Sequence, residues 1–111
     1  MNSALQMKKY HQRDIQSSSP EQLIHKLYGA GITACHQEDQ EKVRAVLMEL
    51  ISALDFEADP ELANRLYSLY EYCLTESALG NFDDALDVLT GLREAWEEGV
   101  LQEAGPDGQD D

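Results

Sequence analysis

The chain has 111 residues, which suits one domain with a core large enough to fold independently. Its 8 Lys and Arg residues and 22 Asp and Glu residues give a formal net charge of −14. This acidic balance argues against binding to nucleic acid or to anionic membrane surfaces, because both depend on clustered cations. The first 13 residues contain no apolar stretch of signal-peptide length, so we expect a cytoplasmic protein of the cytosol.

Residues 1–18 are predicted to form an N-terminal arm that differs in charge from the rest of the chain. Lys8, Lys9 and Arg13 make it weakly basic, whereas the residues that follow are strongly acidic. The arm can fold back onto the acidic helices, or it can be a frayed terminus. Under both interpretations, we expect the helices to carry the function of the protein.

The first predicted helix begins in the segment Ser19-Pro20-Glu21-Gln22, which has the residues of a capping box with proline in the first turn. Apolar residues at helical spacing continue it to a polar turn over residues 36–39. A second helix follows, with an apolar stripe from Val43 to Leu54, and should end near Asp55.

Asp59-Pro60 is predicted to start the third helix, which runs to about Leu79, just before Gly80. Asn81 is a candidate cap for a fourth helix, in which Gly91 would allow a close approach of a neighbouring helix. The apolar face of this helix should extend from Phe82 through Trp96 to Val100.

Four amphipathic helices with short connections predict an all-α protein, an antiparallel up-down four-helix bundle with an N-terminal arm. The bundle domain should cover residues 19–102. Residues 103–111 have nothing to bury, and we expect a disordered acidic tail there.

The third helix is unusual because it carries three tyrosines within six positions, Tyr67, Tyr70 and Tyr72. Tyr70 shares the face that carries Leu62, Leu66 and Leu69, and the other two tyrosines flank that face. Tyrosine has an apolar ring and a polar tip, which suits a surface that binds another polypeptide. An aromatic stripe at helical spacing is also typical of a bundle core, and periodicity alone leaves both interpretations open.

The residues needed for catalysis are sparse, so we expect no enzyme, no cofactor and no metal site. His11, His25 and His36 are scattered, and the glycines do not form a phosphate-binding loop. Cys35 and Cys73 are too few for a disulfide framework or a zinc site. The protein should therefore act by binding.

Several short motifs in chain order resemble the FliS family of flagellar secretion chaperones. They are Tyr10, Ser19-Pro20-Glu21-Gln22-Leu23, Leu27-Tyr28, Leu54-Asp55, Leu66, Leu69-Tyr70-Glu71-Tyr72 and Leu92-Arg93-Glu94-Ala95-Trp96. The similarity extends from Tyr10 to about Glu98, and the order of the motifs makes it specific. The first two helices are shorter than the family pattern, and Asp59-Pro60 replaces a common glycine pair.

The resemblance implies a four-helix bundle that binds the C-terminal segment of flagellin, prevents its premature polymerisation and delivers it to the flagellar type III export gate. An amphipathic segment of flagellin would lie in grooves between the helices. A homodimer is a further possibility when no client is bound.

The family pattern and the helical faces together give a set of candidate partner-binding residues. In the arm, Tyr10 and Ile15 are expected to cover an apolar groove and to move aside for the partner. The full set is Tyr10, Ile15, Leu23, Leu27, Leu66, Tyr67, Tyr70 and Tyr72.

Two other functions fit part of the sequence. The segment Leu79-Gly80-Asn81-Phe82 after a tyrosine-rich helix is similar to the turn of a tetratricopeptide repeat, but no second copy follows at the expected period of about 34 residues. A self-associating helical adaptor without a flagellin client is the other alternative.

Overall fold

The computed structural model describes residues 19–101, which form four helices and a short π-helical turn. The helices are α2 (Pro20–His36), α3 (Gln40–Ser52), α4 (Pro60–Ala78) and α5 (Phe82–Trp96), and the turn η1 (Glu97–Leu101) follows α5 directly. No strand occurs in this part of the chain. Nor does it contain a helix that is both long and apolar enough to cross a membrane.

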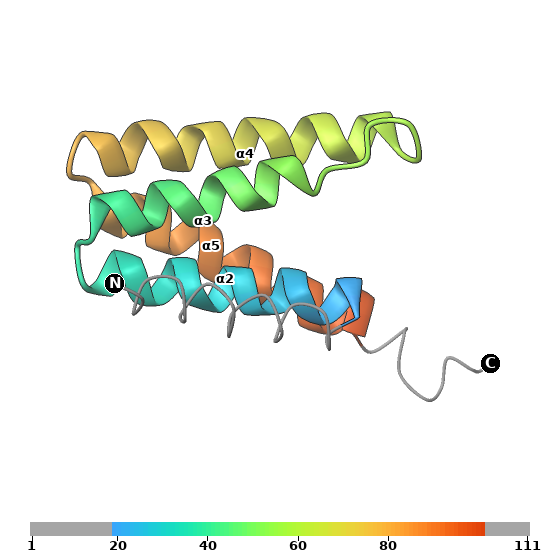
Figure 1. The fold of residues 1–111 in the computed structure, drawn as a ribbon, viewed down its shortest axis with the longest axis horizontal. Helices are drawn as coiled ribbons and strands as arrows, with labels where there is room; N and C mark the ends of the chain where they lie inside the picture. Colours follow the sequence, from blue (N-terminus) through green and yellow to red (C-terminus); the bar gives the residue numbers. More distant parts are fainter. Residues whose placement is uncertain (1–18, 102–111) are drawn as a thin grey trace, which may run out of the picture.

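The helices run up and down in sequence order, so each is antiparallel to the next (Figure 1). α2 packs against α3 and α5, and α4 packs against the same two helices on the other side. The predicted all-α, antiparallel four-helix bundle is therefore confirmed. The predicted arm and acidic tail lie outside the described residues.

Local side-chain bonds fix the starts of three helices where the sequence predicts them. Ser19 Oγ accepts a hydrogen bond from the Gln22 backbone N–H, and the Gln22 side chain accepts one from the Ser19 N–H. Asp39 and Asp59 each accept a bond from the backbone N–H three residues ahead. These bonds satisfy N–H groups that the helices themselves leave without partners.

The start of α5 differs from the prediction. Asn81 occupies the N-cap position, but its side chain makes no cap bond; Asn81 Nδ2 instead donates to Glu76 Oε1 at 2.9 Å. This bond joins the end of α4 to the start of α5 across the turn at Gly80, whose φ of 87° lies in the left-handed region. Asn81 therefore stands at the predicted N-cap position, but its side chain is oriented by Glu76 and its Oδ1 accepts no backbone N–H bond of α5.

The helix ends also differ in detail. α3 ends at Ser52, three residues before the predicted end near Asp55, and the Asp55 carboxylate instead accepts bonds from the N–H groups of Glu57 and Ala58 in the connection. α5 ends at Trp96 and continues as the wider turn η1, so the regular face predicted as far as Val100 ends earlier.

The core contains residues from all four helices, and Gly31 lies at a close approach of α2 to α3 and α5. A Cβ atom at Gly31 would lie 3.0 Å from Leu89 Cδ1 and 3.3 Å from Val46 Cγ1, whereas one at Gly91 would meet nothing within 4 Å. The expected close approach at Gly91 is therefore wrong, and the small residue that matters is Gly31. The buried apolar side chains are Leu27, Tyr28, Ile32, Ala34, Cys35, Val43, Val46, Leu47, Leu50, Ala63, Tyr70, Cys73, Ala85 and Leu89.

Replacement of two glycines in α2 separates helix propensity from packing. Gly29→Ala should raise the unfolding free energy by about 1 kcal/mol, because a Cβ there meets nothing within 4 Å and alanine favours the helix. Gly31→Ala gains the same propensity but crowds Leu89 and Val46, so it should be less stable than Gly29→Ala by about 1–3 kcal/mol. Urea unfolding measures both, and equal stabilisation by the two changes would contradict the close approach at Gly31.

Candidate functional site

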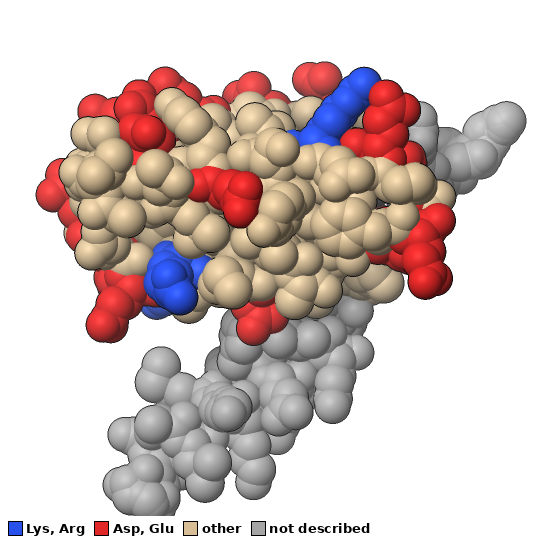
Figure 2. Space-filling view, turned by 90° about the horizontal axis from the view of Figure 1, so that it is seen from above, with Lys and Arg blue, Asp and Glu red and all other residues tan. Residues whose placement is uncertain are grey.

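α4 exposes more large apolar side chains than its role in the bundle requires. Leu62, Tyr67, Leu69 and Tyr72 are all exposed, while Tyr70 and Cys73 of the same helix are buried. The view onto α4 shows a broad surface of uncharged residues with acidic side chains mostly along its margins (Figure 2). Clusters of exposed apolar residues are typical of interaction surfaces.

The three tyrosines of α4 have three different environments. Tyr70 is 2% exposed and belongs to the core. Tyr67 is exposed and packs edge-on against Phe56 of the α3–α4 connection, with ring centroids 6.4 Å apart. Tyr72 is exposed five residues further on, about 140° around the helix from Tyr67.

Nearby carboxylates affect the two exposed tyrosines. A hydrogen bond with Glu71 and the charge of that carboxylate raise the pKa of Tyr67. Partial desolvation, followed by the charges of Asp84 and Glu76, raises the pKa of Tyr72. Because Tyr67 packs against Phe56, it faces the α3–α4 connection. Tyr72 is affected by Asp84 of α5, so it lies on the side of α4 that faces α5.

Three aromatic rings meet inside the bundle, from the middle of α2, the middle of α4 and the end of α5. Tyr28 lies between Tyr70 and Trp96, with ring centroids 6.5 Å and 6.2 Å away. The hydroxyl groups of Tyr28 and Tyr70 form a buried hydrogen bond of 2.7 Å. Burial is the main reason that the pKa of each hydroxyl is raised.

The same aromatic residues line a pocket of about 180 Å³. Its walls come from the first half of α2, the end of α3, the start of α4 and the end of α5. A cavity of about 150 Å³ holds a benzene ring, so this pocket has room for one large side chain. The apolar residues in the walls are Ile24, Tyr28, Leu50, Ala53, Leu54, Ala58, Leu62, Ala63, Leu66, Tyr70 and Trp96.

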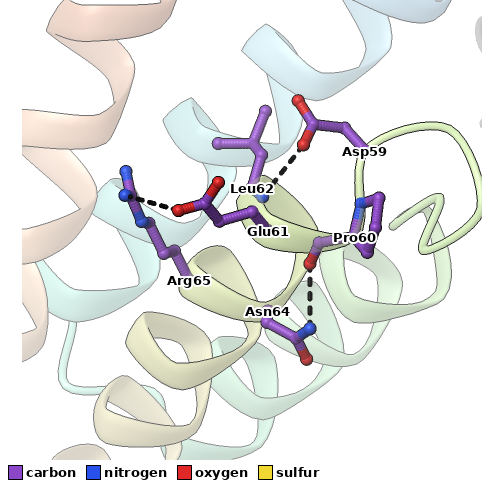
Figure 3. A network of polar contacts seen from close by, with 6 residues as sticks. All are labelled: Asp59, Pro60, Glu61, Leu62, Asn64 and Arg65. Atoms are coloured by element: carbon purple, nitrogen blue, oxygen red, sulfur yellow. Dashed lines mark hydrogen bonds and ion pairs between the residues drawn. The ribbon is translucent and has the colours of Figure 1, made fainter.

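Two carboxylates, Asp55 and Asp59, also line the pocket. One oxygen of each accepts backbone N–H bonds, from Glu57 and Ala58 at Asp55 and from Leu62 at Asp59. Figure 3 shows the bond of Asp59 at the first turn of α4. These bonds fix the two carboxylates at the edge of an otherwise apolar site.

Two polar contacts hold α2 against the end of α5 beside the pocket. Trp96 Nε1 donates to the carbonyl oxygen of Glu21 at 3.0 Å, and His25 Nε2 lies 2.6 Å from Glu97 Oε2. The first contact fixes the indole ring that forms part of the pocket wall.

The two cysteines are buried free thiols away from the pocket. Burial raises the pKa of Cys35, and burial together with the nearby Cys35 raises the pKa of Cys73 to about 12. Both thiols are therefore protonated at neutral pH and pack as small apolar groups.

The structure brings together only part of the candidate set. Leu66 and Tyr70 line the pocket, Leu27 is buried, and Leu23 is half-buried against the core. Tyr67 and Tyr72 lie on different sides of α4, outside the pocket. Tyr10 and Ile15 lie outside the described residues.

Sequence reasoning missed several pocket residues, including Ile24, Leu54, Leu62 and Trp96. A signal was present for two of them, because Leu54-Asp55 and Trp96 belong to the motifs of the family resemblance. The helical pattern alone assigned these apolar residues to the core, since periodicity does not show where four helices leave a space.

The fold and the surface thus define the class of protein: a four-helix bundle with an apolar pocket and exposed aromatic residues on one helix. Residues 36–104 match the family model described as the flagellar protein FliS, which covers well over half of the chain. The chain belongs to the FliS family.

A curated relative supports the same assignment. The flagellar secretion chaperone FliS of Campylobacter jejuni is 29% identical over 119 aligned positions, which cover 88% of this chain and 93% of the relative. No solved structure gives a significant match. The family and the name of this relative support a flagellar secretion chaperone.

The buried hydroxyl pair predicts non-additive effects of Tyr28→Phe and Tyr70→Phe. Each single change should lower the unfolding free energy by about 1–2 kcal/mol, because it leaves the other hydroxyl buried without its partner. The double variant should cost no more than one single change, since no unpaired hydroxyl remains. Urea unfolding of the four proteins tests this, and additive costs would show that the hydroxyls act independently.

The raised pKa values predict a loss of stability at high pH. The ordinary pKa values are 9.0 for cysteine and 10.0 for tyrosine, so the unfolded chain loses protons above about pH 9 while the folded chain keeps those of Cys73, Tyr28 and Tyr70. The unfolding free energy should therefore fall as the pH rises above 9. The double variant Tyr28→Phe and Tyr70→Phe should lose less stability between pH 9 and 11, and an identical pH profile would contradict the assignment.

Proposed function

We propose that this protein binds the C-terminal segment of flagellin in the cytosol, prevents its premature polymerisation and delivers it to the flagellar type III export gate. The observation that carries this proposal is the apolar pocket at the end of the bundle, next to the exposed apolar residues of α4. Both lie on a member of the FliS family, to which a curated flagellar secretion chaperone also belongs.

The exposed residues and the pocket suit an amphipathic helical client. Leu62 belongs to both features, since it lines the pocket and remains 50% exposed. Such a client could insert one side chain into the pocket and lay its remaining apolar residues along α4. Helix-in-groove recognition of this kind depends on a few anchoring side chains of the bound helix.

The arm has a proposed role in controlling access to this surface. Tyr10 and Ile15 would cover the apolar surface in the free protein and move aside when the client binds. Their basic neighbours Lys8, Lys9 and Arg13 would favour contact with an acidic bundle. Both residues lie outside the described part of the chain, so this role stays a prediction.

The bundle fold and the family favour this function over the two alternatives considered. A tetratricopeptide module would stack helix pairs, whereas here four helices surround one core. Self-association through the exposed residues of α4 would compete with client binding, so a homodimer should dissociate when the client is added.

The proposal is tested by calorimetric titration with the C-terminal segment of flagellin from the same organism. We expect saturable one-to-one binding with a negative heat-capacity change, because apolar surface is buried. Leu62→Gln should weaken binding by about fivefold or more, since the exposed half of Leu62 would lose apolar contacts with the client.

Met48→Gln is the matched control for Leu62→Gln. Met48 is 45% exposed on α3 and does not line the pocket, so its replacement removes a similar apolar surface elsewhere. Equal losses for the two variants would argue against the pocket as the binding site. Absence of binding by the wild-type protein would argue against the flagellin client itself.

A further inference from the structure

The pocket at the end of the bundle has a chemical asymmetry that restricts what it can bind. Its walls are apolar, but Asp55 and Asp59 lie on one side of it, where the α3–α4 connection meets α4. An apolar side chain inserted into the pocket would therefore bring the residues next to it close to two negative charges.

Within residues 19–101, neither carboxylate has a cationic partner. The nearest arginine in sequence, Arg65, bonds Glu61 at 3.2 Å instead and lies on the other side of the first turn of α4 from Asp59 (Figure 3). The backbone bonds to one oxygen of each aspartate leave its charge in place, and its second oxygen makes no hydrogen bond with the described part of the chain.

The interior of the pocket contains a second feature that points to an occupant. Tyr28 and Tyr70 are 1% and 2% exposed, and both line the pocket. Only one hydroxyl can donate in the bond between them, so the other hydroxyl proton has no acceptor among the described residues. A buried donor without an acceptor is unfavourable, and a group or water that enters the pocket can relieve it.

We propose that the pocket receives one large side chain of the client, apolar except for an atom that accepts a hydrogen bond from the tyrosine pair, and that Asp55 and Asp59 bind a lysine or arginine within one helical turn of it. The inference rests on the proposed function and specifies the client residues that this end of the bundle recognises. The apolar anchor supplies most of the affinity, and the cation fixes the direction and register in which the client helix lies.

The charges of the two aspartates can be removed without loss of their structural bonds. Asparagine keeps a side-chain oxygen that accepts backbone N–H bonds, and it is as good an N-cap as aspartate. The double variant D55N/D59N should therefore fold like the wild type while carrying two fewer negative charges. Circular dichroism and urea unfolding check that it does.

D83N/D84N is the matched control. Asp83 and Asp84 are exposed in the first turn of α5, at the opposite end of the bundle, and their replacement changes the net charge by the same amount. Any general effect of net charge on binding appears equally in both double variants.

The experiment titrates each protein with the C-terminal segment of flagellin from the same organism, at about 25 mM and 200 mM salt. D55N/D59N should bind about three- to tenfold more weakly than D83N/D84N at low salt, and the difference should shrink at high salt because exposed charges are screened. Each lysine and arginine of the segment is then replaced by glutamine. One replacement should weaken binding to the wild type but not to D55N/D59N.

Two results would overturn the inference while leaving the proposed function in place. One is equal affinity of D55N/D59N and D83N/D84N for a segment that binds the wild type. The other is a loss that no single lysine or arginine of the segment accounts for. If the segment does not bind the wild-type protein at all, the proposed function fails and this inference fails with it.

Discussion

The contact among Tyr28, Tyr70 and Trp96 connects the packing of this bundle to its binding site. Tyr28 of α2 and Tyr70 of α4 belong to helices that both pack against α3 and α5, so their hydroxyl bond crosses the interior. Trp96 brings α5 into the same cluster through its ring contact with Tyr28 and its bond to the Glu21 carbonyl. These large rings connect α2, α4 and α5 and also line the pocket.

A pocket at one end of a bundle suits a protein that handles a flexible client. The helices need only their inner faces for stability, so the start of α4 can expose Leu62 while Ala63 beside it remains buried. The start of α4 thus keeps apolar surface that the core does not use. A chaperone for secretion needs such a surface to bind its client.

The distribution of charge complements this arrangement. The chain has a net charge of −14, which keeps an apolar surface soluble and opposes its association with other acidic proteins. Acidic side chains that accept backbone N–H bonds, such as Asp55 and Asp59, have defined positions. Defined positions allow a charge to contribute to specificity.

The sequence by itself determined the helices, their order and most of their starts, because capping boxes, prolines and apolar periodicity act over only a few residues. Ser19-Pro20 and Asp59-Pro60 behave as predicted for this reason. Asn81 stands at the predicted N-cap position but makes no cap bond, because its bond to Glu76 orients the side chain across the turn. Tertiary structure alone decided that Gly31, and not Gly91, lies at a close helix approach and that Tyr70 is core while Tyr67 and Tyr72 are surface. It also placed Trp96 beside Tyr28, since a pocket arises from side chains far apart in the chain whose relative positions depend on how four helices pack.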